Sequence, residues 1–225
     1  MPNSMLSRTA ASPQSQEDQE SRVVYIVDDE ELVRGALGSL LRSIDLEVRA
    51  FATTEEFLAA PRAGGPSCLV LDVRLRGQSG LALQQSLLQL DLPSIPIIFM
   101  TGHGDIAMTV KAMKAGAVDF LSKPFRDQDM IDAVTAALDN DAKRLKVRRM
   151  LGELRDNWNS LTPREREVVQ HVATGLMNKQ IAANMGIAEI TAKIHRGQAM
   201  RKMNSRSVAE LVRKMEALGV VQNLT

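Results

Sequence analysis

Five polar side chains stand at the ends of apolar runs in the first half of the sequence. Asp28 and Asp29 follow the run VVYIV, and Asp72 ends the run CLVLD. Thr101 ends IIFMT, and Lys123 follows DFLS. If these runs are strands of an open parallel sheet, their carboxyl ends converge on one crevice. Three carboxylates, a hydroxyl and an ammonium in that crevice could hold a divalent metal and receive a phosphoryl group.

The combination of these groups favours phosphoryl chemistry. Carboxylates that share a crevice repel one another, and a Mg²⁺ ion relieves this because it prefers carboxylate oxygens and water. Asp72 can then attack phosphorus, since aspartate side chains can act as nucleophiles that form acyl phosphates. Lys123 can pair with the product, and Thr101 can donate a hydrogen bond to it. The plainer interpretation is that such residues only cap the following helices, but five of them in one alternating pattern disfavour it.

The elements that must position these side chains alternate regularly between residues 22 and 140. Five nearly continuous apolar strands alternate with helical patterns, which is typical of a parallel sheet covered by helices on both faces. Thr53 and Glu56 form a capping-box pattern at the start of one helix. The expected helices are 30–43, 53–60, 79–90, 105–115 and 126–140.

The second half of the sequence shows helical patterns only. Thr162 and Glu165 form another capping box, with proline at the first helical position. Gly175 and Gly186 are expected to end two helices. A helix, a tight turn with glycine and a longer polar-faced helix are typical of a helix-turn-helix. The expected helices are 163–174, 177–184, 188–203 and 205–217.

The segment from residue 130 to 158 contains no proline and has leucines at near-helical spacing. It could form one long connecting helix, with Gly152 as its weak point. Such a helix could be a solvated linker or a pairing seam between two protomers, and the pattern spans too few heptads to decide.

Composition and charge limit the classes of function. Residues 21–140 carry a net charge of −5, whereas residues 141–159 carry +3 and residues 160–225 carry +5. This split indicates two domains with different partners, and the basic one suits nucleic acid. The single cysteine, Cys68, excludes a disulfide framework and fits a reducing cytosol. No apolar stretch is long enough for a membrane span, so a cytoplasmic protein without a membrane partner is expected. Residues 1–21 are polar and expected to be disordered.

The residues singled out above resemble the receiver domain of bacterial two-component response regulators. The Asp-Asp pair, the strand-end Asp, the Thr and the Lys-Pro sequence stand in family order and spacing. The segment TGHGDIAMTVKAMKAGAVDFLSKPF is similar to the FixJ-type subgroup in particular. In the second half, LTPREREVV, GLMNKQIAANMGI and KIHR are similar to the LuxR-type DNA-binding domain. The two resemblances cover about residues 22–125 and 160–213.

The receiver resemblance implies that Asp72 accepts a phosphoryl group from a sensor histidine kinase. It also implies that Asp29, Asp72 and the backbone carbonyl of Arg74 hold Mg²⁺, with Asp28 helping through water. Thr101 and Phe120 would form the switch pair, in which the hydroxyl moves toward the phosphoryl group and the ring fills the space.

One residue departs from the receiver pattern. The family usually has proline four residues after the phosphorylated aspartate, and Arg76 stands there in this sequence. The loop should be less rigid, and Arg74 and Arg76 bring two extra cations near the site. The lifetime of the phosphorylated state is therefore open.

The LuxR-type resemblance implies that helix 188–203 enters the major groove, with Lys193 and Ile194 among the residues that reach bases or phosphates. His195 matches the usual family residue, and packing and base reading remain equally open for it. Gly197 replaces a family side chain that can approach DNA, so no base contact is assigned there. The expected DNA-binding residues are Lys179, Thr191, Lys193, Ile194, His195 and Arg196, together with Arg201, Lys202 and Arg206 as phosphate contacts.

These expectations combine into an α/β plus all-α architecture. It comprises a flavodoxin-like, doubly wound, five-stranded parallel receiver domain (22–140), a helical linker (141–159) and a four-helix LuxR-type helix-turn-helix domain (160–225). The expected function is a phosphorylation-switched transcriptional regulator, and the subgroup resemblance favours an activator. Phosphorylation would promote a homodimer through the face that carries helix 105–115 and the strand with Phe120. The expected partners are a sensor histidine kinase, double-stranded DNA, RNA polymerase and a second copy of the chain, with Mg²⁺ as cofactor.

The chain is not expected to be an enzyme. A Mg²⁺-dependent phosphohydrolase with an aspartate nucleophile usually has a second Asp two residues after the first, and here that residue is Arg74. Another alternative is a receiver that works without phosphorylation. Its acidic pocket would normally be degraded, whereas this one is complete.

Overall fold

The computed structural model contains two compact units, which divide between Lys143 and Arg144. The expected disordered tail lies outside the described residues apart from Ser21, as do Leu90 and Asp105 at the ends of two expected helices. The described residues are 21–77, 79–89, 95–102 and 106–220.

The N-terminal unit is built on a five-stranded parallel sheet with the strand order β2-β1-β3-β4-β5. This confirms the expected doubly wound α/β fold. The central strands β1 and β3 are almost entirely buried, because helices cover both faces of the sheet. The strands are β1 (Val23–Val27), β2 (Glu47–Phe51), β3 (Ser67–Asp72), β4 (Ile97–Thr101) and β5 (Asp119–Ser122).

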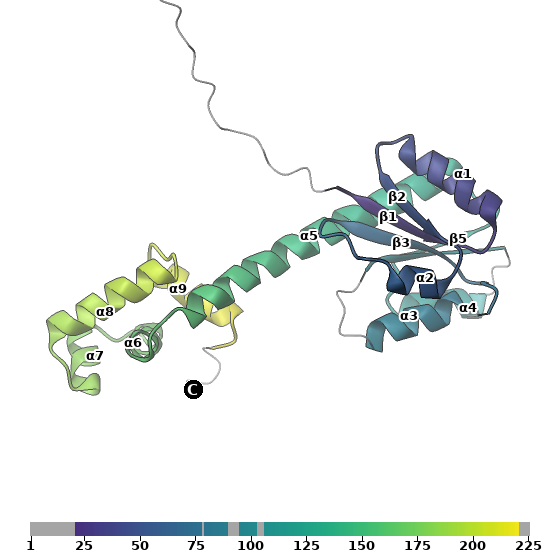
Figure 1. Ribbon diagram of the computed structural model, residues 1–225. Helices are drawn as coiled ribbons and strands as arrows, with labels where there is room; N and C mark the ends of the chain where they lie inside the picture. The colour runs from purple at the N-terminus through teal and green to yellow at the C-terminus, as the bar shows by residue number, and fades with distance from the viewer. Residues whose placement is uncertain (1–20, 78, 90–94, 103–105, 221–225) are drawn as a thin grey trace, which may run out of the picture. The chain divides into compact units, whose positions relative to one another are not determined.

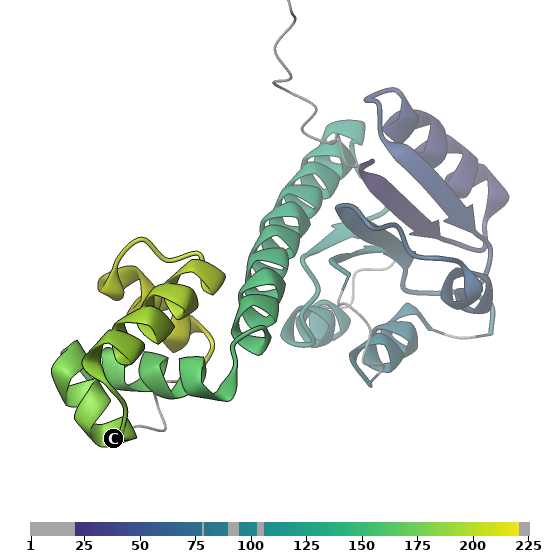
Figure 2. The ribbon, with the colours of Figure 1, turned by 60° about the vertical axis from the view of Figure 1, so that its left-hand side comes forward.

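Two layers of helices enclose this sheet, as Figures 1 and 2 show. On one face, Leu41 of α1 and Leu138 of α5 belong to a single buried cluster. On the other face, Phe57 of α2, Leu83 of α3 and Ala112 of α4 belong to a second cluster. The helices are α1 (Glu31–Arg42), α2 (Thr54–Ala59), α3 (Gly80–Gln89), α4 (Ile106–Lys114) and α5 (Asp127–Asn159).

The register of the strands brings their carboxyl ends to one edge. Val27 of β1 pairs with Leu71 of β3, and Thr101 of β4 pairs with Ser122 of β5. The residues that follow these pairs therefore emerge side by side, at the edge where open α/β sheets bind ligands.

The long connecting helix is continuous. Helix α5 has 33 residues and passes through Gly152 without a break. A Cβ atom at Gly152 would meet no other atom within 4 Å, so no packing constraint requires glycine there.

The C-terminal unit consists of the end of α5 and four further helices around one core. Leu154 and Trp158 of α5 pack against this core. Thr162 and Glu165 form the expected capping box before α6, and Gly186 ends α7 in the left-handed conformation with φ 63°. The four helices are α6 (Pro163–Ala173), α7 (Asn178–Met185), α8 (Glu189–Lys202) and α9 (Val208–Ala217).

The other expected capping box is only half formed. Thr53 accepts a hydrogen bond from the Glu56 amide, as expected. The Glu56 carboxylate, however, accepts from the amide of Ala52 instead of Thr53. The sequence pattern does not distinguish these two neighbouring amides.

Gly80 packs tightly against the strand that carries Asp72. A Cβ atom at Gly80 would lie 2.3 Å from the backbone oxygen of Asp72, which is an impossible contact. We expect Gly80→Ala to lower the free energy of unfolding by about 1–3 kcal/mol, as overpacking usually does. Urea denaturation followed by circular dichroism measures this change.

Gly35 of α1 provides the matched control, because a Cβ atom there meets nothing within 4 Å. Gly35→Ala should stabilise the unit by up to about 1 kcal/mol through helix propensity. The fluorescence of Trp158, the only tryptophan, reports on the C-terminal unit and should not change in either variant. Equal stability of the two variants would contradict the packing argument.

Candidate functional site

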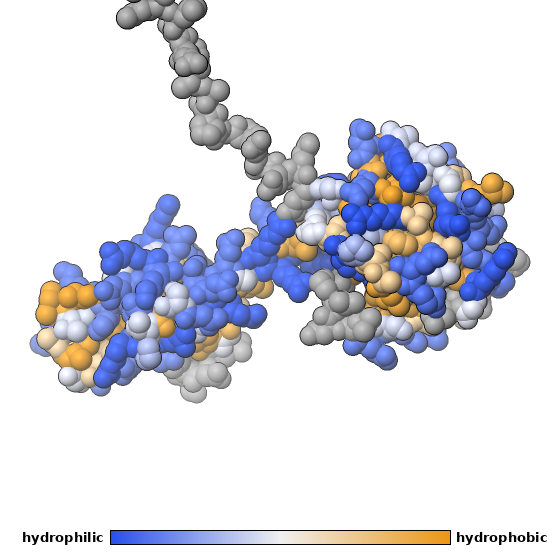
Figure 3. Space-filling model, viewed as in Figure 1, coloured by the Kyte–Doolittle hydropathy of each residue, from blue (hydrophilic) through white to orange (hydrophobic). Residues whose placement is uncertain are grey.

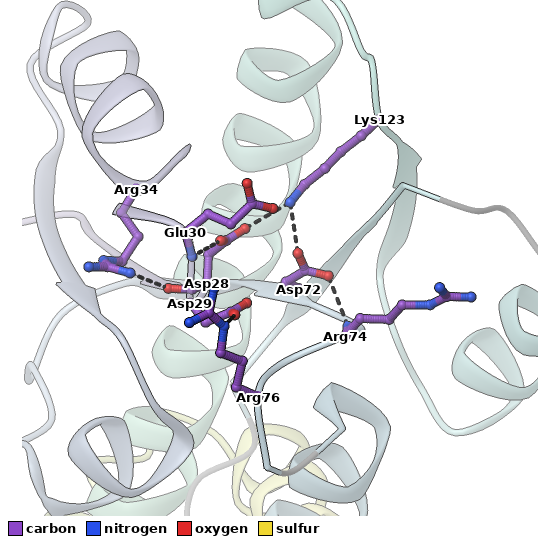
Figure 4. A network of polar contacts seen from close by, with 8 residues as sticks. All are labelled: Asp28, Asp29, Glu30, Arg34, Asp72, Arg74, Arg76 and Lys123. Carbon is purple, nitrogen blue, oxygen red and sulfur yellow. Dashed lines mark hydrogen bonds and ion pairs between the residues drawn. The ribbon is translucent and has the colours of Figure 1, made fainter. Parts of the chain in front are cut away.

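One ammonium group bridges two carboxylates at the carboxyl edge of the sheet. Lys123 follows β5, and its Nζ donates to Asp28 Oδ2 at 2.8 Å and to Asp72 Oδ2 at 2.7 Å. Asp28 is fully buried and Asp72 is 5% exposed. Figure 4 shows the lysine reaching both acids from one side. Residues separated by up to 95 positions in the sequence thus meet in one site.

Backbone groups fix the orientation of both carboxylates. Asp28 Oδ1 accepts from the Glu30 amide at 2.8 Å, and Asp72 Oδ1 accepts from the Arg74 amide at 2.9 Å. The Arg34 guanidinium donates to the Asp28 backbone carbonyl at 2.7 Å. Sequence reasoning missed Glu30 and Arg34, because neither stands at a strand end.

Burial and pairing shift the pKa values of Asp28 and Lys123. Burial raises the pKa of the Asp28 carboxyl, although hydrogen bonds from Lys123 and the Glu30 amide oppose the shift. Burial alone would lower the pKa of Lys123, but its hydrogen bonds to Asp28 and Asp72 outweigh this, so that pKa is raised. One cation therefore serves both carboxylates, and burial makes the charged form of Asp28 costly.

A third carboxylate completes the cluster. Asp28, Asp29 and Asp72 each offer one oxygen within 4.8 Å of the others. Hard oxygen donors in such a group suit Mg²⁺, which binds through one or two carboxylates and retains waters for phosphate oxygens to replace. The donor set therefore fits the expected ion.

Arg76 forms an ion pair with one of these three acids. Its Nε lies 2.9 Å from Asp29 Oδ2, and its side chain is 89% exposed. In Figure 4 the Arg74 side chain instead points away from the acids. Of the two extra cations expected near the site, only Arg76 contacts a carboxylate of the cluster among the described residues.

The expected switch residues lie on the same side of the sheet. Thr101 is fully buried at the end of β4, and the Lys123 amide donates to its backbone oxygen at 2.7 Å. Phe120 pairs with Phe99 in the register of β4 and β5, with ring centroids 6.4 Å apart. Side chains alternate along a strand, so Phe99 and Thr101 lie on the same face of the sheet. The Phe120 ring therefore packs against a residue of β4 that stands two positions before Thr101.

The C-terminal unit exposes one stripe along α8. Its members recur at helical spacing on a single face, and three of them are apolar or lack a side chain. Ile190 is 63% exposed and Ile194 is 51% exposed. The stripe consists of Ile190, Lys193, Ile194, Gly197 and Arg201.

Four of the expected DNA-binding residues are engaged inside the unit or partly buried. Lys202 donates to the buried carboxylate of Glu165 at 2.7 Å and to a backbone oxygen, which leaves it less free for phosphate. Arg196 donates to the Asn178 side chain at 3.0 Å. The His195 Nδ1 is buried and has no hydrogen-bond partner among the described residues, which favours packing over base reading. Thr191 is half-buried, whereas Lys179 and Arg206 are exposed.

Both halves of the chain match known families. The response regulator receiver domain matches residues 24–135, and the luxR family of bacterial regulatory proteins matches residues 159–215. Nodulation protein W from Bradyrhizobium diazoefficiens is 54% identical over 203 residues, which cover 90% of this chain and 89% of that protein. The chain belongs to the two-component response regulators with a LuxR-type DNA-binding domain.

Further similarities to response regulators extend over both units. Transcriptional regulatory protein FixJ from Azorhizobium caulinodans is 39% identical, over 89% of this chain and 95% of its own length. The solved structure of response regulator StyR has 47% identity and a TM-score of 0.81, and it covers 87% of this chain and 98% of its own. The FixJ-type resemblance is thus confirmed.

Family membership gives this response regulator its general role. It is a transcriptional regulator whose receiver domain implies a histidine kinase partner and whose LuxR-type domain implies DNA binding. The family is not enzymatic, which disfavours the phosphohydrolase alternative. Among the described helices, none has the length and apolarity needed to cross a membrane.

The Arg76 ion pair should weaken Mg²⁺ binding by this response regulator. The guanidinium pairs with the Asp29 carboxylate and so competes with the ion for it, and its positive charge repels the ion. We expect Arg76→Gln to tighten Mg²⁺ binding about 1.4- to fivefold, since an exposed ion pair contributes only about 0.2–1 kcal/mol. Isothermal titration calorimetry with Mg²⁺ measures the dissociation constant.

Arg126→Gln is the matched control for this prediction. Arg126 is 84% exposed and forms a similar surface ion pair, with Asp129. Removing it lowers the charge of the same unit by the same amount without touching the three acids. If both variants bind Mg²⁺ equally tightly, the contact with Asp29 is not what limits binding.

Proposed function

We propose that Asp72 is the phosphoacceptor of this response regulator and that its phosphorylation promotes DNA binding. In the reaction, an Asp72 carboxylate oxygen attacks the phosphorus of a phosphohistidine on the sensor kinase. A phosphorus–oxygen bond forms, the phosphorus–nitrogen bond breaks, and the imidazole leaves with the bond's electron pair. The observation that carries this proposal is the oriented Asp72 carboxylate beside two further acids and one ammonium.

Mg²⁺ would be held by Asp29, Asp72 and the backbone carbonyl of Arg74, with Asp28 acting through water. When bound, the ion neutralises charge on the phosphoryl oxygens. Arg76, which is paired with Asp29, would compete with the ion for that carboxylate.

Lys123 and Thr101 then respond to the new charge. The phosphoryl group on Asp72 carries more negative charge than the free carboxylate did. Lys123 therefore donates its hydrogen bond to the phosphoryl group instead of to the Asp72 oxygen. The Thr101 hydroxyl moves to donate to the same group, and the Phe120 ring occupies the space left behind. Such a local electrostatic change shifts an existing equilibrium between two conformations.

The altered conformation pairs with a second copy of the chain through α4 and β5. Helix α4 exposes Ile106, Val110 and Met113, which recur at helical spacing and are 80%, 45% and 43% exposed. An apolar stripe of this kind is costly to leave in water and supports a homodimer interface. In the C-terminal part of α5, Val147, Met150 and Leu151 are also exposed, which supports the pairing seam over the solvated linker.

The dimer binds two DNA half-sites with α8 in the major groove of each. Lys202 and Arg196 are paired inside the unit, so other cations supply the phosphate and base contacts. These are the exposed residues Lys179, Lys193, Arg201 and Arg206. The regulator then recruits RNA polymerase as an activator. In this scheme the receiver spans residues 22–140, the linker 141–159 and the DNA-binding domain 160–225.

The experiment is a DNA titration of three species at two salt concentrations. They are unphosphorylated full-length protein, full-length protein treated with acetyl phosphate and Mg²⁺, and a fragment from Arg144 to Thr225. The fragment begins at Arg144 because Leu154 and Trp158 complete the core of the C-terminal unit. Affinity should rise about 5- to 150-fold on phosphorylation, the usual range of allosteric coupling.

Binding should also weaken steeply with salt, because bound cations displace counterions from DNA. The fragment should bind without phosphorylation, since it lacks the receiver. If all three species bind identically, the receiver does not control this domain, and the phosphorylation-independent alternative is favoured.

A further inference from the structure

The exposed face of α8 carries a hollow that the fold does not require. Ile190, Lys193, Ile194, Gly197 and Arg201 line it. A Cβ atom at Gly197 would meet no other atom within 4 Å, so a larger residue would fit without disturbing the protein. Glycine within a helix costs about 1 kcal/mol relative to alanine. Neither packing nor backbone conformation explains why this position lacks a side chain.

The walls of the hollow combine apolar groups with cations. Ile190 and Ile194 are 63% and 51% exposed, and Lys193 and Arg201 are exposed beside them. Figure 3 shows apolar surface at the end of the C-terminal unit where α7 leads into α8, within otherwise largely hydrophilic surroundings. A ligand complementary to this surface has an apolar projection close to negative charge.

Double-stranded DNA offers one such combination in its major groove. The 5-methyl group of thymine is the apolar group that base edges present there, and phosphates flank it. From residue 190 to residue 197 the helix rises about 10 Å, which corresponds to roughly three base-pair steps of 3.4 Å. The hollow therefore faces a short run of base pairs.

We propose that the surface around Gly197 reads thymine, with the 5-methyl group seated in the hollow against Ile194 and Ile190. This inference rests on the proposed DNA-binding function and adds a base preference to it. The missing side chain lets the groove floor approach the helix, Lys193 donates to a neighbouring base edge and Arg201 contacts a phosphate. Gly197 is then a position that determines base specificity, although its lack of a side chain first argued against a base contact there.

The test uses a duplex selected from a randomised pool by the phosphorylated full-length protein. Each thymine is replaced in turn by deoxyuridine, which removes the methyl group and keeps every hydrogen-bonding group. At one or more positions in each half-site, binding should weaken about fourfold per methyl group, the effect of exposing one buried carbon. The other positions should be insensitive.

Variants of Gly197 then locate the contact. Gly197→Leu fills the hollow, so it should weaken binding to the thymine duplex and abolish the difference between thymine and deoxyuridine at those positions. Gly197→Ala should reduce that difference while raising the stability of the C-terminal unit, measured by urea denaturation with Trp158 fluorescence. Loss of specificity with a gain in stability separates a DNA contact from a structural role.

Gly152→Ala is the matched control, because Gly152 is also helical and open but lies in α5. It should leave the response to deoxyuridine unchanged. The inference is overturned if the selected duplex tolerates deoxyuridine at every position, or if Gly197→Leu weakens the thymine and deoxyuridine duplexes equally. Either result leaves the proposed function intact as long as phosphorylation still increases DNA binding, whereas loss of that increase overturns the proposed function itself.

Discussion

Replacing Asp72 with asparagine abolishes phosphoryl acceptance while the protein stays folded. The amide is nearly isosteric and can keep the hydrogen bond from the Arg74 amide, which is 2.9 Å long in the native protein. It lacks the negative charge and the nucleophilic oxygen that attack on phosphorus requires. After incubation with acetyl phosphate and Mg²⁺, mass spectrometry should find one base-labile phosphoryl group on the native protein and none on the variant.

Asp139→Asn serves as the control for this loss. Asp139 lies on α5 in the same unit, and it pairs with Arg22 at 2.9 Å and not with a residue of the acidic cluster. It should be labelled like the native protein. Undiminished labelling of Asp72→Asn would show that another group accepts the phosphoryl.

Replacing Lys123 with alanine separates phosphorylation from its consequence. The variant keeps the three acids, so it should still bind Mg²⁺ and accept the phosphoryl group. It lacks the ammonium that bridges Asp28 and Asp72 and that would follow the phosphoryl group. We expect it to lose the 5- to 150-fold increase in DNA affinity that typical allosteric coupling gives, measured by DNA titration before and after phosphorylation.

The free energy of unfolding of Lys123→Ala must be measured together with its DNA affinity. Removing one partner of a buried ion pair often costs about 3–5 kcal/mol, and Mg²⁺ in the buffer offsets the lost charge. Lys143→Ala, an exposed lysine of α5, should respond to phosphorylation normally. A native increase in DNA affinity by folded, phosphorylated Lys123→Ala would mean that the ammonium has no part in the switch.

Local sequence patterns were sufficient to predict the elements of this protein. The strands are continuous apolar runs because helices cover both faces of the sheet, and each run ends where a polar residue must reach water or a ligand. The capping box of Thr162 and Glu165 and the turn at Gly186 depend on residues that are close in sequence. The long helix α5 was only one of the possibilities, because helical spacing does not reveal whether a chain is interrupted at Gly152.

The tertiary structure decided which charged side chains contact one another. Lys123 crosses to Asp28 and Asp72 because the spatial order of strands is β2-β1-β3-β4-β5, and no local pattern encodes that order. The Arg76 pair with Asp29 arises for the same reason, because β1 and β3 are neighbours in the sheet. The tight approach of Gly80 to Asp72 depends instead on the conformation of the connection between β3 and α3.

The sequence by itself determined the receiver and helix-turn-helix patterns and the residue types of their sites, since these follow from periodicity and from the chemistry of single side chains. It could not tell which cations of the C-terminal unit are free. Lys202 and Arg201 are neighbours with equal charge, yet Lys202 points to the buried Glu165 while Arg201 lies on the exposed stripe. Only the packing of α6 against α8 separates them, because a rotation of about 100° per residue along a helix sends adjacent side chains to different surroundings.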